Sequence, residues 1–156
     1  METDLKNTNS LNIANCIADN DWIKVEEYFN NSAFLTHLGI TVSLDNPDLP
    51  RCEISHLEPF HLGGIGQNFV NGAIISSILD LSVGLTALKY SKMGKFATSS
   101  LNIEMARPVD NGRFYAISKR NRIIGKKLFS EATIFNSNDE PCVYASGILR
   151  IGINNA

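Results

Sequence analysis

The pattern of apolar residues along the chain is organised around one stretch, Phe69 to Lys89, in which Asp80 is the only charge before the closing lysine. Apolar side chains recur in it at steps of three and four, which is the spacing of a helix face. Further apolar residues between these positions widen the face far beyond that of a surface helix. A helix that is apolar over most of its circumference lies in a core, covered by other elements. The stretch therefore predicts a buried central helix.

One strip of this helix is small and polar instead of apolar. Its residues follow one another at steps of three and four, with a carboxylate in the middle: Ala73, Ser76, Ser77, Asp80, Gly84 and Ala87. Ionising an unpartnered carboxylate in apolar surroundings is costly, so its presence indicates either satisfaction by neighbouring hydroxyls or a chemical role. The residues alone leave both interpretations open.

The rest of the chain predicts short helices followed by strands. Residues 1–17 are polar, rich in Asn and Thr towards their start, and predict a flexible N-terminal tail. The other expected elements are short helices at 22–29 and 32–38, strands at 40–44 and 51–56, a glycine-containing loop at 59–68, and a meander of four strands at 96–106, 113–121, 127–135 and 142–151. We expect one α+β domain over residues 18–156, with the short helices as an N-terminal extension.

One antiparallel sheet would cover only part of a helix this apolar. A sheet that curls around the helix, together with a second copy of the chain, would complete the cover. The sequence therefore predicts a homo-oligomer.

Composition excludes several classes of function. A net charge of −2 and a pI near 5.9 argue against nucleic acid as the main partner. The central stretch is long enough to cross a membrane, but its Asp, Gly and Ser content suits a protein core better than lipid. The three cysteines show neither metal-ligand spacing nor a disulfide framework. We expect a cytoplasmic protein without a metal, a cofactor or a membrane partner.

Two segments resemble a known family. Val70-Asn-Gly-Ala-Ile-Ile-Ser-Ser-Ile-Leu-Asp80 and the strand from Thr98 that ends in Arg107-Pro108 are similar to the signatures of the hotdog-fold acyl-CoA thioesterases of the phenylacetate-degradation (PaaI) type. The resemblance covers roughly residues 35–151. It implies a hotdog fold, with a long central helix wrapped by a curved antiparallel sheet, in a dimer or a tetramer.

The spacing of two candidate residues adds a constraint. Asn71 and Asp80 lie on opposite sides of the helix, separated by about 13.5 Å along its axis. One helix cannot bring both to the same substrate atom, whereas two helices of a dimer can. The resemblance implies such a composite site. In it, the Gly72 N–H would bind the thioester carbonyl, and Asp80 of the partner subunit would act as general base or nucleophile. Asn71 would orient the water or the carbonyl.

The resemblance also implies contacts with the substrate from the loop, the helix and the strands: Gln67, Asn68, Ser77, Thr98, Ser99, Gly125 and Lys126. The chain departs from the family pattern at two positions, because Asn71 stands where the family has His and Gly63 where it has Asn. Gln67 or Asn68 could take over the role of the missing Asn.

A basic cluster follows the hairpin between the second and third of the last four strands: Lys119, Arg120, Arg122, Lys126 and Lys127. One interpretation is a solvated strand edge, where lysines oppose aggregation. The other is a seat for the phosphates of coenzyme A.

We therefore expect an acyl-CoA thioesterase that hydrolyses a small, medium-chain or aromatic acyl-CoA. The alternative is a non-catalytic acyl-CoA-binding hotdog protein, which the departures at Asn71 and Gly63 favour. A hotdog dehydratase is disfavoured, because no His–Asp pair has suitable spacing on or before the central helix.

Overall fold

The computed structural model describes residues 13–64, 66–91 and 95–152. A first helix covers residues 13–18. The elements that follow are α2 (Trp22–Asn30), α3 (Ala33–Leu38), β1 (Ile40–Ser43), β2 (Arg51–Ile54), the 3-10 helix η1 (Pro59–His61), α4 (Gly72–Leu85), the 3-10 helix η2 (Leu88–Tyr90), β3 (Phe96–Met105), β4 (Phe114–Ile124), β5 (Lys127–Phe135) and β6 (Pro141–Ile151).

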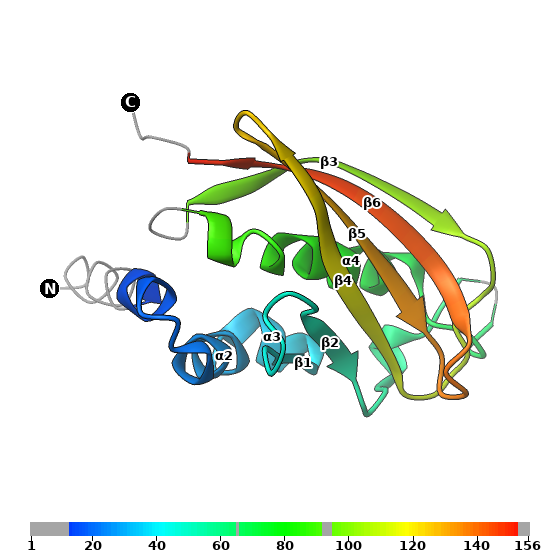
Figure 1. Cartoon of the computed structure of the whole chain (residues 1–156). Coiled ribbons are helices and arrows are strands. Elements are labelled where there is room, and N and C mark those ends of the chain that lie inside the picture. The colour runs from blue at the N-terminus through cyan, green and yellow to red at the C-terminus, as the bar shows by residue number, and fades with distance from the viewer. Residues whose placement is uncertain (1–12, 65, 92–94, 153–156) are drawn as a thin grey trace, which may run out of the picture.

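The six strands form one antiparallel sheet in the order β1-β2-β4-β5-β6-β3. The sheet curls around α4, which lies in its concave side (Figure 1). The expected α+β architecture is confirmed. The expected meander is correct only for β4, β5 and β6, because β3 pairs with β6 at the far edge instead of with β4.

The central helix begins at Gly72, three residues later than the apolar pattern predicts. Phe69 and Val70 are extended, and they form isolated bridges with Asp110 and Leu62 respectively. Both are apolar, so hydrophobic spacing alone could not separate them from the helix. Asn71 then caps the first turn: its side-chain oxygen accepts a hydrogen bond from the Ile74 N–H at 2.9 Å.

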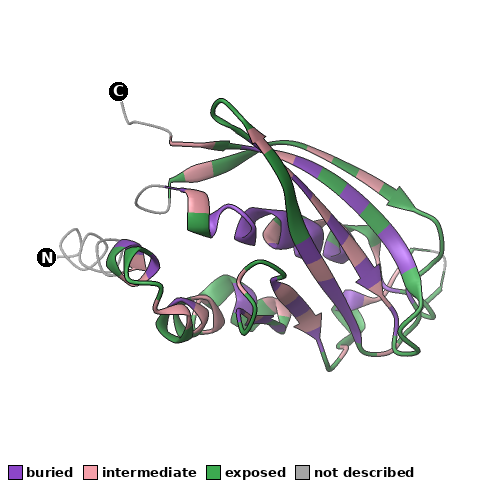
Figure 2. Ribbon diagram, viewed as in Figure 1, coloured by how far each residue is buried: buried purple, intermediate pink, exposed green. Residues whose placement is uncertain are grey.

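The side of α4 that faces the sheet is fully buried (Figure 2). Ile75, Ile78, Leu79 and Val83 are at most 2% exposed, and full burial of such a side chain contributes about 1.5–3 kcal/mol. The helix approaches β6 closely at Gly147, where an added Cβ would lie 3.1 Å from the Val83 side chain. The segment Gly72–Tyr90 is long and apolar enough to span a bilayer, but 61% of its most apolar window is buried inside the protein.

Two hydroxyl groups donate hydrogen bonds to carbonyls in the last turn of α4. The Ser118 hydroxyl on β4 donates to the Ser82 carbonyl at 2.7 Å, and the Thr86 hydroxyl donates to the Val83 carbonyl at 2.7 Å. Carbonyls in the last turn of a helix lack the usual intrahelical partner, so the Ser118 hydroxyl satisfies the buried Ser82 carbonyl. The Val83 carbonyl also accepts from the Thr86 N–H at 3.3 Å.

Part of the N-terminal segment is helical. Residues 13–18 are helical, and Ala14 and Ile17 are buried, whereas the sequence predicts a flexible tail through Ile17. Residues 1–12 of that predicted tail lie outside the described residues. Asp21 caps the start of α2, and Gly39, which is left-handed with a φ of 68°, ends α3. The expected helices at 22–29 and 32–38 are therefore present.

Ser118→Ala tests the hydroxyl bond that ends the helix. We expect it to lower the free energy of unfolding by about 1–3 kcal/mol, because the buried Ser82 carbonyl loses its partner. Urea denaturation would measure this loss. Ser137→Ala, which removes an exposed hydroxyl from a turn, is the control and should change stability by less than about 0.5 kcal/mol. Equal effects of the two substitutions would contradict a specific role for Ser118.

Candidate functional site

The two edges of the sheet differ in whether side chains cover the backbone groups of the edge strand. On the β1 edge, the Asn30 side chain of α2 accepts from the Val42 N–H at 2.8 Å and donates to its carbonyl at 2.9 Å, and Glu26 accepts from the Leu44 N–H at 2.7 Å. Side chains therefore close this edge. β3 at the other edge pairs with β6 on one side only, and most of its residues are exposed (Figure 2). An open edge is a template for pairing with another strand.

The open edge strand runs alongside α4. An added Cβ on Gly84 would lie 3.4 Å from the Phe96 ring, and one on Gly72 would lie 3.6 Å from the Met105 methyl. The start of β3 thus lies at the end of α4, and the end of β3 lies at the start of α4. The small, polar strip of the helix lies between these two contacts, on the side towards the open edge.

The structure divides this strip into an open part and a covered part. Gly84 and Ala87 are buried. The earlier part of the strip is exposed or half-buried: Ala73, Ser76, Ser77 and Asp80. The Ser76 and Ser77 hydroxyls donate back to the Gly72 and Ala73 carbonyls at 2.8 Å each. Neither serine hydroxyl therefore donates a hydrogen bond to Asp80.

Asp80 is exposed, and its carboxylate has no hydrogen bond or ion pair with any residue that the structure describes. An intrachain structural role, in which neighbouring hydroxyls hold the carboxylate, therefore finds no support among these residues. The carboxylate is available to a substrate or to a second copy of the chain.

The start of α4 offers donors for an anion. Asn71 uses its side-chain oxygen for the cap and its side-chain N–H groups for the carbonyls of Phe60 at 2.9 Å and Leu62 at 3.5 Å. The backbone N–H groups of Gly72 and Ala73 have no acceptor among the described residues. Both residues are exposed. Two unpaired N–H groups at the positive end of a helix dipole can bind developing negative charge.

His61 lies in the loop before this turn, and both of its ring nitrogens have hydrogen-bond partners. Its Nδ1 accepts from the Glu58 N–H at 2.8 Å, so its Nε2 carries the proton and donates to the Leu38 carbonyl at 2.7 Å. The ring is 1% exposed. Its backbone carbonyl accepts from the Asn71 N–H at 2.8 Å, which fixes the entry to α4. His61 is therefore a structural residue of the loop.

Ser77 lies on α4, and the other six predicted substrate-binding residues fall at two opposite ends of the sheet. Gln67 and Asn68 are exposed in the loop before Gly72, near the end of β3. Thr98 and Ser99 lie near the start of β3. The β4–β5 hairpin with Gly125 and Lys126 belongs to this second end, because Lys127 pairs with Arg150 and Arg150 with Ala97. One chain therefore does not bring the two groups together. A two-fold axis at the β3 edge would, because it sets the end of one strand beside the start of the other.

Two exposed apolar side chains near Gly72 were not predicted as site residues. Met105 is 54% exposed and Phe69 is 41% exposed. Strand alternation places Met105 on the core face with Leu101 and Ile103, and the helical pattern includes Phe69. Both patterns therefore predict burial. Met105 stays open beside Gly72 because β3 is the edge strand. Phe69 is exposed in the extended segment before the helix.

Comparison with solved structures identifies the fold. No family model matches the sequence, and no curated protein matches it. A Shewanella oneidensis protein related to the thioesterase superfamily matches with a TM-score of 0.74 at 18% identity, over 84% of this chain and 95% of its own. PaaI of E. coli, from the phenylacetic acid degradation operon, matches with a TM-score of 0.70 at 17% identity, over 86% of this chain and 94% of its own. A thioesterase family protein from Silicibacter pomeroyi matches with a TM-score of 0.69 at 18% identity, over 83% of this chain and 97% of its own.

These likenesses show the fold: the chain has the hotdog fold found in structures of the thioesterase superfamily. The resemblance to PaaI that the sequence suggests is confirmed at this level. Fold alone does not establish chemistry, so the roles of Asp80, Asn71 and Gly72 stay predictions.

Asn71→Ala tests the structural role of the residue at the start of α4. We expect a loss of about 0.5–2 kcal/mol in the free energy of unfolding, because the helix loses its N-cap. Asn71→Ser keeps an oxygen that can cap the helix and should lose less. Chemical denaturation of both variants would check this. Equal losses would mean that the bond to the Phe60 carbonyl matters more than the cap.

Proposed function

We propose that this protein is an acyl-CoA thioesterase with composite sites between two copies of the chain. The observation that carries the proposal is the unpartnered Asp80 carboxylate on an open strip of α4, beside the only sheet edge that side chains leave uncovered among the described strands. The fold supports it, since the matched structures include members of the thioesterase superfamily.

In the proposed dimer, the β3 strands of two copies pair across a two-fold axis. The start of α4 in one copy then approaches the middle of α4 in the other, and the exposed strip is covered. This arrangement would also bury the apolar side chains at the β3 edge. A dimer of two such dimers remains compatible with it.

The proposed chemistry divides between the two subunits. Asp80 of the partner subunit accepts a proton from water as the water oxygen attacks the thioester carbonyl carbon, or attacks that carbon itself as nucleophile. The negative charge that forms on the carbonyl oxygen binds to the N–H groups of Gly72 and Ala73. The C–S bond then breaks, and the CoA thiolate leaves and takes up a proton. On the nucleophilic route, water then hydrolyses the anhydride between the acyl group and Asp80, which releases the free acid and restores the carboxylate. Asn71 acts chiefly by holding the helix start in place.

The environment of the Gly72 N–H indicates the kind of acyl group. Met105 lies next to it, Phe69 precedes it by three residues in the chain, and both are exposed. We propose that these two side chains contact an aliphatic or aromatic acyl chain. Gln67, Asn68, Ser77, Thr98, Ser99, Gly125 and Lys126 are the proposed contacts for the remainder of the substrate. We place the protein in the cytoplasm, in keeping with its three free cysteines.

A non-catalytic acyl-CoA-binding protein is the second candidate. It is favoured by the hydrogen bonds of Asn71, because all of them go to the chain itself. An amide also cannot carry a proton to or from a substrate. In this case the same interface would bind the thioester without hydrolysing it.

Asp80→Asn separates the two candidates. With the wild-type protein we expect thiol release from at least one member of a panel of short, long and aromatic acyl-CoAs. The variant should lose this activity by about 10²-fold or more, because an amide cannot act as base or nucleophile. CoA binding, measured by calorimetry, should survive. Asp45→Asn, at an exposed position in the β1–β2 turn, is the matched control. An unchanged rate in Asp80→Asn would remove Asp80 from the mechanism, and binding without release in the wild type would identify a binder.

Mixed dimers test whether the sites are composite. Gly72→Pro removes one N–H at the first helical position, where proline is tolerated, and Asn71 before it has the extended ψ of 154° that a following proline requires. Each of Gly72→Pro and Asp80→Asn alone should be nearly inactive. Co-expressed in equal amounts, they should recover about a quarter of the wild-type activity, since half of the dimers would carry one intact site. Failure to recover activity, with mixed dimers detected by mass, would place both groups in one protomer.

A further inference from the structure

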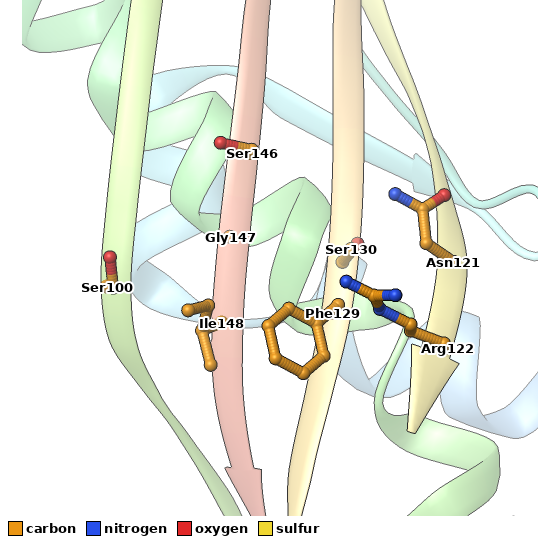
Figure 3. Close-up of a pocket in the computed structure, with 8 residues that line it drawn as sticks. All are labelled: Ser100, Asn121, Arg122, Phe129, Ser130, Ser146, Gly147 and Ile148. Atoms are coloured by element: carbon orange, nitrogen blue, oxygen red, sulfur yellow. The ribbon is translucent and has the colours of Figure 1, made fainter. Parts of the chain in front are cut away.

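The outer face of the sheet carries a second polar surface, separated from α4 by the sheet itself. A groove with a cavity volume of about 370 Å³ lies there across β4, β5, β6 and β3. Figure 3 shows its lining residues: Ser100, Asn121, Arg122, Phe129, Ser130, Ser146, Gly147 and Ile148. This volume is in the range of pockets that bind small molecules.

The strand register explains why these side chains meet. Arg122 pairs with Phe129, Phe129 with Ile148, and Ile148 with Ser100, so the four form one row across the sheet. A β-bulge interrupts β3 next to Ser100, and another interrupts β4 next to Arg122. Bulges re-aim side chains locally and are frequent at functional sites.

The row has an apolar middle and polar surroundings. Phe129 and Ile148 form its floor, and the Arg122 guanidinium lies 5.2 Å from the centroid of the Phe129 ring. Ser146 and Asn121 lie on the side of the groove that leads to the centre of the sheet. An aromatic ring and a guanidinium plane together provide a surface on which a planar base can stack.

Two basic side chains lie beside this row of four residues, on the side away from Ser146. Lys127 and Arg150 stand directly opposite each other in the next row, and both are exposed. Like charges at paired positions are unfavourable unless an anion lies between them. Within the described residues, neither of them nor Arg122 has a carboxylate within 4.0 Å.

The basic cluster predicted from the sequence is therefore divided by the fold. Lys119 lies outside the groove and pairs with Glu131 at 2.9 Å. Arg120 lies over the Tyr90 ring, 4.5 Å from its centroid. The Lys119 ammonium, with Asn121 and Tyr144, lowers the pKa of Glu131. Glu131, the acidic group next to the groove, thus stays ionised, and Lys119 compensates its charge.

We propose that this groove binds a phosphorylated nucleoside. The base stacks on Phe129 beside Arg122, the hydroxyls of Ser100 and Ser146 meet polar atoms of the ligand, and the phosphate lies between Lys127 and Arg150. Free nucleotides and the nucleotide end of coenzyme A share this chemistry. The proposal is independent of thioester hydrolysis, because it concerns the opposite face of the sheet.

Calorimetry with AMP, adenosine 3′,5′-bisphosphate and CoA tests the proposal on the full chain. We expect saturable binding that weakens by about tenfold or more in Arg122→Gln combined with Arg150→Gln, because the guanidinium beside the base and a charge-assisted bond to the phosphate are both lost. Phe129→Ala should also weaken it, through the lost stacking surface. All of these side chains face outward, so circular dichroism should show unchanged folding. Lys24→Gln, which removes a charge from α2, is the control.

Absence of binding for all three ligands would overturn the proposal. So would equal weakening in Lys24→Gln, since that would indicate a general charge effect. Competition then identifies the source of the ligand. If CoA displaces AMP and the same substitutions weaken both, the groove holds the nucleotide end of CoA. If AMP remains bound at saturating CoA, the groove is a separate nucleotide site. Neither result depends on whether the protein hydrolyses any thioester.

Discussion

The burial of α4 is the constraint on which the rest of the structure depends. Its Ile, Leu and Val side chains need cover on most of the helix circumference, and the curved sheet supplies it on all but one side. Close approach needs small or hydroxyl-bearing partners, and these occur where the helix touches the sheet. Gly147 makes room for Val83, and Ser118 binds the last turn. The side that stays open is the side that carries Asp80.

The contrast between the two sheet edges indicates what could cover the open side of α4. At the β1 edge, Asn30 satisfies both backbone groups of Val42, much as another strand would. Nothing comparable covers β3 among the described residues. A protein that closes one edge with side chains and leaves the other open next to an exposed carboxylate is suited to pairing with a second copy there. The two halves of the candidate site lie at opposite ends of β3, which fits the same arrangement.

Much of the fold could be read from the sequence because local patterns determine it. Element ends are marked by residues with their own capping or turn chemistry. In the structure, Asp21 and Ser32 cap helices, and Gly39 and Gly125 adopt left-handed turn conformations. Errors arose where local pattern and tertiary contact diverge. Phe69 and Val70 continue the helical spacing, yet they pair with Asp110 and Leu62. β3 follows the helix directly in the chain, yet its partner is the last strand, through contacts that no local signal encodes.

For the site, the sequence by itself determined which groups are present: a carboxylate on a small-residue strip, a glycine at the start of the helix, and a basic hairpin. Residue spacing sets these features, and spacing is local. Only the tertiary structure decided which groups are free to act. In the structure, Asn71 caps α4 and His61 donates to the Leu38 carbonyl, whereas Asp80 has no partner among the described residues. Lys119 pairs with Glu131 and Arg120 lies over Tyr90, so only Arg122 of these three basic residues lines the groove. Availability depends on which polar groups already have partners, and those partners come from segments far apart in the chain.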